Sequence, residues 1–238
     1  MLASDLDRVA RGRLRTLSKD NADGVARHLV MAGRLLDEDP ELAYAHAEAA
    51  VRRAGRVDVV REAAGITAYR TGRYAEALRE LRTVRRLNGS DEHLPLMADC
   101  ERGLGRPERA LALAQEDGAR ELPVELRVEL AIVVSGARID LGDPEAAVAA
   151  LSTPEVASAS GELAARVTEA RAAALEAAGR RDEARAALAS LPQGYGDLAA
   201  EDDVVVFDLE DDADEARAGD DVGASAGESS GATDTDGA

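Results

Sequence analysis

Aromatic side chains are nearly absent from this sequence. Its 238 residues include no tryptophan, one phenylalanine and four tyrosines, although 45% of them belong to the hydrophobic class. The apolar surface must therefore come mainly from alanine, leucine and valine, which favours helices packed closely through small side chains. The composition favours helices, and the repeated intervals described below predict an all-α protein.

Cysteine and lysine are equally scarce, with one residue each. Because Cys100 is alone, an intramolecular disulfide and a multi-cysteine zinc site are excluded. Lys19 does not follow a glycine-rich loop, so we expect neither a P-loop nor a lysine Schiff base. Long apolar runs are missing too, and Asp5 and Asp7 stand where a signal peptide is apolar. We therefore expect a cytoplasmic protein without a membrane partner.

Candidate catalytic groups do not assemble into a site in the sequence. His28, His46 and His93 lie 18 and 47 residues apart, without the spacing of a helical metal-binding pair, so we expect neither a metal nor another cofactor. Ser225 stands in a Gly-Ala-Ser-Ala-Gly match to the hydrolase nucleophile elbow, but acidic residues flank it where a buried strand is required. Cys100 falls inside an expected helix, where a buried structural thiol is the common outcome. These patterns predict a protein without catalytic residues.

Charge divides the chain in two. The formal net charge is −18, but residues 197–238 alone hold 15 acidic residues and one basic residue. Such a segment cannot bury enough apolar surface to offset its ordering entropy, and we predict a disordered acidic tail over 196–238. The remaining chain is nearly balanced, and it contains a basic stretch at 51–90 with ten arginines against four acids.

Small residues recur at fixed intervals before this tail. Each copy has a glycine, an alanine five residues after it and a small residue seven residues before it. The glycines are Gly72, Gly105, Gly142 and Gly179, the alanines are Ala77, Ala110, Ala147 and Ala184, and the small residues are Gly65, Ala98, Ser135 and Ala172. These intervals predict helical hairpins, in which the glycine ends the first helix in the left-handed region and the small residue permits a close crossing. Pro107 and Pro144 fit the starts of second helices.

The N-terminal region lacks this pattern. Ser4 and Asp7 have the spacing of a capping box and predict one helix over 5–18 that caps the repeats. The polar residues from Asp20 to Gly24 indicate the cap of the next helix, which would begin at Val25. The predicted organisation is therefore a capping helix in 1–24, helical repeats in 25–195 and the acidic tail in 196–238.

The repeats resemble the tetratricopeptide repeat (TPR), a 34-residue helix–turn–helix unit with small residues at its eighth and twentieth positions. The best copy covers residues 61–89 and carries Gly65, Gly72 and Ala77 at matching positions. The middle of the chain is also similar to cytosolic actinobacterial TPR proteins, a resemblance that implies no particular activity. The TPR resemblance implies a right-handed superhelical solenoid of about five hairpins, whose concave groove binds another protein or a peptide segment.

Transfer of the TPR groove positions onto this sequence gives a candidate partner-binding set. Its members are His28, Leu35, Glu62, Ile66, Tyr69, Arg70, Asp99, Arg102 and Ile139. Tyr69 and Arg70 are the strongest candidates, because tyrosine and arginine are favoured anchors of interfaces. The resemblance implies a non-catalytic scaffold or adaptor.

Binding of RNA or a ribonucleoprotein is the alternative. It would use a basic patch of Arg79, Arg82 and Arg86, which recur at helical spacing. Glu76 and Glu80 are placed to neutralise the same arginines, so the patch is also compatible with an ordinary solvated helix face.

The acidic tail contains the only phenylalanine of the chain. Val205, Phe207 and Leu209 form a short apolar segment inside an acidic run, which predicts either a segment that docks on the basic stretch or an unbound tail. If the tail docks, it competes with anionic partners.

Overall fold

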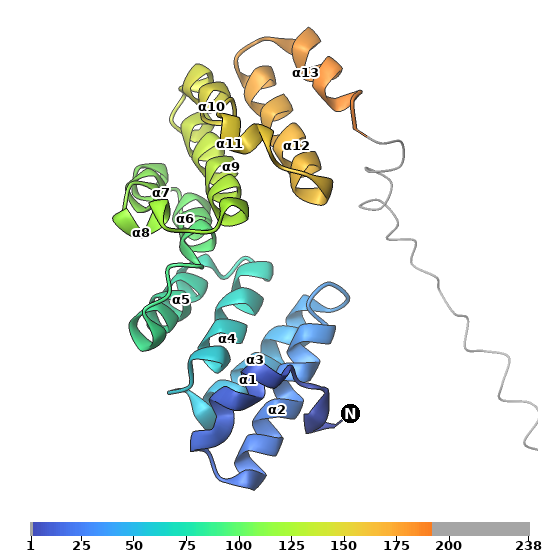
Figure 1. Ribbon diagram of the computed structural model, residues 1–238, viewed down its shortest axis with the longest axis vertical. Coiled ribbons are helices and arrows are strands. Elements are labelled where there is room, and N and C mark those ends of the chain that lie inside the picture. Colours follow the sequence, from blue (N-terminus) through green and yellow to red (C-terminus); the bar gives the residue numbers. More distant parts are fainter. Residues whose placement is uncertain (1, 192–238) are drawn as a thin grey trace, which may run out of the picture. The chain divides into compact units, whose positions relative to one another are not determined.

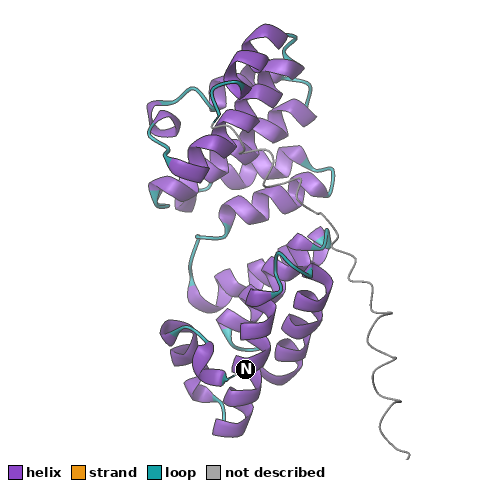
Figure 2. Cartoon of the chain, turned by 90° about the vertical axis from the view of Figure 1, so that its right-hand side faces the viewer, coloured by secondary structure: helices purple, strands orange, loops and turns teal. Residues whose placement is uncertain are grey.

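In the computed structural model, which describes residues 2–191, every regular element is helical (Figure 1). This part of the chain has thirteen α-helices and two short 3-10 helices, and no strand occurs in it (Figure 2). The all-α class predicted from the repeated intervals is confirmed for the described residues.

The N-terminal segment differs from the single helix predicted over 5–18. It consists of a 3-10 turn η1 (Ala3–Asp5), a short helix α1 (Arg8–Arg13) and a second 3-10 turn η2 (Leu14–Thr16). Asp7 rather than Ser4 caps α1, because its carboxylate accepts the backbone N–H groups of Val9 and Ala10 at 2.7 and 3.2 Å. The prediction of one continuous capping helix is wrong.

Helix α2 (Lys19–Arg34) begins six residues before the predicted start at Val25. Asp20 lies in its first turn, where a carboxylate is favoured by the partial positive charge of the helix N-terminus. The acidic residues that indicated a cap therefore lie inside the helix, and the predicted boundary at 24/25 falls within α2. Its partner is α3 (Pro40–Ala54), which Asp39 caps by accepting the N–H of Leu42 at 2.9 Å.

Each of the four later hairpins turns at one of the predicted glycines. The pairs are α4 (Asp58–Arg70) with α5 (Tyr74–Asn88), α6 (Leu94–Gly103) with α7 (Pro107–Ala114), α9 (Val124–Asp140) with α10 (Pro144–Ala150), and α12 (Gly161–Ala177) with α13 (Arg181–Leu188). Their φ angles are 71° at Gly72 and Gly105, 75° at Gly142 and 78° at Gly179. The prediction of left-handed glycines is confirmed.

The small residues lie where the two helices of a hairpin cross. A Cβ atom added to Gly65 would stand 2.7 Å from Cδ2 of Leu81, and Leu81 is fully buried. Ala98, Ser135 and Ala172 are also buried. The absence of a larger side chain at these positions is what permits the close approach.

Two short helices account for the longer repeat intervals. Gly72 and Gly105 are 33 residues apart, whereas the next two intervals between these glycines are 37 residues. Helix α8 (Asp117–Arg120) follows α7 and helix α11 (Pro154–Ala157) follows α10, so that each longer interval contains one added turn of helix between hairpins. The later units keep the hairpin and extend the connection.

The hairpins contact one another in chain order. Helix α3 packs on α4, α5 on α6, α7 on α9 and α10 on α12, and the first helices α6, α9 and α12 also touch in sequence. Buried side chains lie at these contacts. Cys100, for example, is fully buried in a cluster with Leu78, Leu81 and Met97, which confirms the prediction of a structural thiol.

Residues 196–238 lie outside the described residues, together with the predicted docking residues Val205, Phe207 and Leu209 and the serine of the elbow match, Ser225. Of the helices in residues 2–191, none combines the length and the apolar character needed to cross a bilayer.

Candidate functional site

A groove of about 990 Å³ is lined almost entirely by the first helices of four successive hairpins. These are α4, α6, α9 and α12, with Glu92 and His93 from the approach to α6. Because the same helix of each hairpin contributes, the side chains that face the groove recur every three or four residues along each helix. The groove is thus a product of the repeat.

Most of the predicted partner-binding residues come together in this groove. Six of the nine line it, namely Ile66, Tyr69, Arg70, Asp99, Arg102 and Ile139. Glu62 lies beside it, with its Oε1 3.3 Å from Nε2 of His93. His28 instead lines a separate pocket between α2 and α3, and Leu35 ends α2, so the structure does not place these two with the rest.

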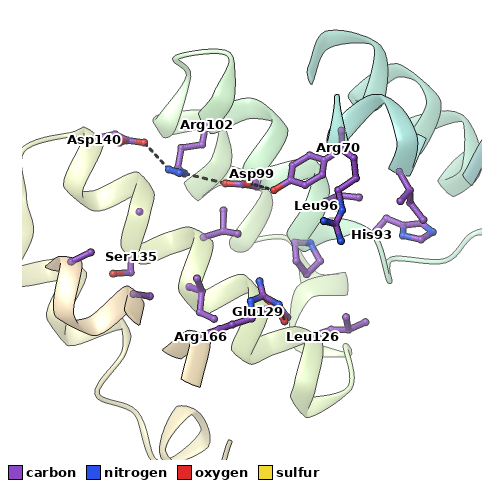
Figure 3. A pocket seen from close by; sticks show the side chains of 18 of the residues that line it. Arg70, His93, Leu96, Asp99, Arg102, Leu126, Glu129, Ser135, Asp140 and Arg166 are labelled. Atoms are coloured by element: carbon purple, nitrogen blue, oxygen red, sulfur yellow. Dashed lines mark hydrogen bonds and ion pairs between the residues drawn. The ribbon is translucent and has the colours of Figure 1, made fainter. Parts of the chain in front are cut away.

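A polar network crosses the groove from α4 to α9. The hydroxyl of Tyr69 donates to Oδ2 of Asp99 at 2.5 Å, and Nε of Arg102 donates to the other oxygen of that carboxylate at 3.1 Å. Arg102 also reaches Asp140, with 3.6 Å between Nη1 and Oδ2 (Figure 3). Gly136 permits this path, since a Cβ atom at that position would lie 3.1 Å from the guanidinium carbon of Arg102.

Burial and the hydrogen bond to Asp99 raise the pKa of Tyr69 well above its ordinary value. Tyr69 therefore stays protonated near neutral pH and acts as a donor to Asp99. A phenol held in this way fixes the positions of α4 and α6 at the groove, and it is poorly suited to act as a base or nucleophile.

The far side of the groove has a second ion pair and an apolar strip. Arg166 on α12 donates to Glu129 on α9 (Figure 3). The groove lining also includes half-buried aliphatic side chains, among them Ile66, Ile132 and Val133. Five acids and three arginines line the whole groove, so its formal charge is −2 with histidine neutral.

Every arginine in the lining is engaged by an acid. Besides Arg102 and Arg166, Arg70 pairs with Asp37 at 3.2 Å. Glu92 makes no ion pair with any residue of the described part, and Asp140 is exposed. The groove consequently offers apolar contact together with excess negative charge.

Sequence reasoning missed much of α9 and all of α12. The lining residues that were not predicted include Leu96, Leu126, Glu129, Ile132, Val133, Ser135, Gly136, Asp140 and Arg166. Extending the helical period from Ile139 back along the same helix would have found most of those on α9. Arg166 lies on α12, the first helix of the last hairpin. The weaker repeat pattern of that hairpin did not identify it as a groove residue.

The basic patch is largely neutralised by ion pairs. Arg79 pairs with Glu76 at 3.4 Å, as the i,i+3 spacing suggested, and also with the adjacent Glu80 at 3.0 Å. Arg82 instead pairs with Glu101 of α6 at 2.7 Å. Arg86 is exposed and forms no ion pair with a described residue. One open guanidinium of three gives little support for an RNA-binding face.

The groove has few groups that could perform a reaction. Its only hydroxyl besides Tyr69 is that of Ser135, which is 1% exposed and lacks a hydrogen-bond partner among the described residues. A serine nucleophile needs an adjacent base, and none contacts this hydroxyl there. No cluster of three or more potential metal ligands occurs within residues 2–191. The arrangement is suited to binding.

Comparison with protein-family models, with curated proteins and with solved structures gives no match for this chain.

Proposed function

We propose that this protein is a non-catalytic scaffold or adaptor that binds a segment of another protein in the groove of α4, α6, α9 and α12. The observation that carries the proposal is the groove itself, which brings together six residues at positions where the TPR resemblance implies partner contacts. Its volume of about 990 Å³ lies at the upper end of the range for small-molecule sites, which suits a polypeptide segment.

The proposal includes a TPR-like arrangement, in which the hairpins stack as a right-handed solenoid. Three features support it: the left-handed glycines between paired helices, the small residues at their crossings and the contacts of α9 with both α6 and α12. In such a stack the first helices line one surface, and partner specificity depends on their exposed residues.

The lining indicates the chemistry of the partner. Apolar side chains of a partner that cover Ile66, Ile132 and Val133 would stabilise the complex by about 25 cal/mol for each Å² of apolar surface removed from water. The excess of acids favours a positive partner, since the groove's own arginines are already paired. We therefore expect an extended or helical segment that combines aliphatic side chains with lysine or arginine.

Selection from a random peptide display library against the full chain tests this expectation. The enriched peptides should combine aliphatic and basic residues, and a labelled representative should bind in a fluorescence anisotropy titration. Ile132→Arg should weaken that binding by about tenfold or more, because it replaces apolar contact with a like charge. Ile132 is half-buried and belongs to none of the core clusters, so the variant should fold.

Leu87→Arg is the matched control. Leu87 is 41% exposed on α5, a second helix that contributes nothing to the groove, and its replacement should leave affinity unchanged. The proposal is overturned if no peptide is enriched, if the enriched peptides are acidic, or if both variants bind alike.

A further inference from the structure

A second pocket, of about 330 Å³, lies between α2 and α3 and is independent of the groove. Its ionisable lining residues are Arg27, His28, His46, Arg53 and one acid, Asp20. The two imidazoles face each other, with 2.9 Å between their Nδ1 atoms and 5.2 Å between ring centroids. Sequence reasoning does not identify this pair, because its members are 18 residues apart on different helices.

The distance between the Nδ1 atoms restricts the protonation of the pair. One nitrogen must donate and the other must accept, so at least one imidazole is neutral in this arrangement. Protonation of both rings would place two N–H donors against each other, and the rings would have to separate. The separated rings would then offer two donors to any acceptor in the pocket.

The two arginines of the pocket have unused donors. Nε of Arg27 donates a hydrogen bond to the backbone oxygen of Asp23 at 3.1 Å. The terminal nitrogens of Arg27 have no partner among the described residues. Arg53 extends over the face of α2 at Gly24, where its Nη1 would be 3.4 Å from an added Cβ atom. Neither guanidinium forms an ion pair with a described acid, in contrast to the three arginines of the groove.

The charged surroundings of His28 are mainly positive. Burial lowers its pKa first, and His46, Arg53, Arg52 and Arg27 lower it further in that order. Most charged groups on the adjoining elements contact other charged residues outside the pocket. Asp5 lies against Arg34, Asp58 against Arg13, Arg61 against Glu80 and Glu62 against His93. Arg15 and Asp23 form no ion pair within the described part. An anion in the pocket would offset this positive field.

We propose that the pocket binds the phosphate group of a small molecule, held by Arg27 and Arg53, with uptake of two protons by the pair of His28 and His46, one on each imidazole. Two guanidinium groups match the oxygens of a tetrahedral dianion, and the fully protonated pair adds two N–H donors that the neutral pair lacks. The volume lies at the lower end of the range for small-molecule sites and suits a compact ligand. By thermodynamic linkage the coupling is reciprocal. A bound anion raises the proton affinity of the histidine pair, and protonation of the pair raises the affinity for the anion by the same factor.

Histidine titration by NMR on the full chain tests the proposal. Inorganic sulfate is the primary probe because it remains a dianion throughout the titration, and inorganic phosphate is the second. Sulfate should raise the pKa of His28 relative to chloride at equal ionic strength of about 0.15 M. A rise of about 0.5 corresponds to a roughly threefold tighter binding of sulfate to the protonated pair.

Arg53→Gln should abolish the sulfate-dependent rise, whereas Arg86→Gln should preserve it. Both arginines are exposed, and neither forms an ion pair with a described acid, so the two variants remove equal charge at equal structural cost. The proposal fails if sulfate leaves the His28 titration unchanged, or if the rise persists in Arg53→Gln. A rise lost equally in both variants would also overturn it, because general charge screening would then explain the effect.

Discussion

The crossing of α4 and α5 at Gly65 gives the sharpest test of the repeat architecture. Gly65→Ala places a methyl group 2.7 Å from Cδ2 and 2.9 Å from Cγ of Leu81, whose side chain is fully buried. Overpacking of this kind costs about 1–3 kcal/mol. Alanine recovers about 1 kcal/mol through its higher helix propensity. We expect the free energy of unfolding to fall by about 0–2 kcal/mol.

Truncation of the partner side chain should reverse the sign. Leu81→Ala alone removes a fully buried leucine and should cost about 2–5 kcal/mol. In that background the two clashing atoms are gone, and the next nearest atom is the backbone nitrogen of residue 81 at an ordinary 3.5 Å. Gly65→Ala should then stabilise the protein by about 1 kcal/mol. The coupling between the two substitutions is expected to be about 1–3 kcal/mol.

Urea denaturation followed by circular dichroism measures all four corners of this cycle. Gly33→Ala is the matched control, because Gly33 is also helical, has no atom within 4 Å of an added Cβ and should gain stability in either background. Equal effects of Gly65→Ala with and without Leu81 would refute the close crossing. If the slope of unfolding free energy against urea concentration differs among the variants, the repeats unfold separately. The urea concentrations at the midpoints of unfolding would then be compared instead.

Four further outcomes are expected. Gly72→Val should cost about 1–2 kcal/mol in the same assay because a β-branched residue opposes a φ of 71°, and a loss below about 0.5 kcal/mol would contradict this. The lowered pKa of His28 means that the unfolded chain binds the proton more readily, so stability should fall as pH drops through about 6.5 toward the lower native value; His28→Gln should flatten this dependence in thermal melts. Burial raises the pKa of Cys100 to about 12, so a thiol reagent should label it only in denaturant, and rapid labelling of the native chain would count against its burial. Cutting after Gly196 removes a formal charge of −14 and should raise affinity for an acidic peptide or RNA at about 20–50 mM salt, with the gain shrinking at higher salt; equal affinities would exclude an electrostatic effect of the tail.

The hairpin turns could be predicted because their information is local. A glycine with φ near 71° and a proline at the next helix start each satisfy a backbone requirement that few other residues meet. The small residue at the crossing and the buried Cys100 followed from the same period. Six groove positions, Tyr69 and Asp99 among them, were expected because the TPR resemblance implies which positions of the first helices face a groove.

The errors occurred where local signals competed. Asp20 and Asp23 suit a cap, yet they are equally acceptable in the first turns of a helix, so their types could not locate the start of α2. Asp7 caps α1 by accepting the backbone N–H groups of Val9 and Ala10, so this helix begins after Asp7 rather than at residue 5 as expected. His28 was assigned to the groove by repeat position, but the first hairpin lacks the glycine turn, and only the packing of α2 on α3 could reveal its contact with His46.

A count of charges along the chain did not predict which arginines are neutralised in the folded protein, because ion pairs join residues on different helices. The stretch 51–90 holds ten arginines against four acids, yet its arginines reach acids on other helices. Arg61 pairs with Glu80 and Arg82 with Glu101, each 19 residues away, and Arg73 pairs with Glu41, 32 residues away.

These separations are of the order of one helix or one hairpin, because an arginine on one helix faces an acid on its neighbour. Glu80 and Glu101 are buried, so removing either arginine partner leaves a buried carboxylate with fewer donors, a loss larger than that of an exposed pair. Five of the ten arginines of 51–90 thus pair with acids outside their own helix, namely Arg61, Arg70, Arg73, Arg82 and Arg85. The pocket of Arg27 and Arg53, where the cations lack acid partners in the described residues, is the better place to seek an anionic ligand.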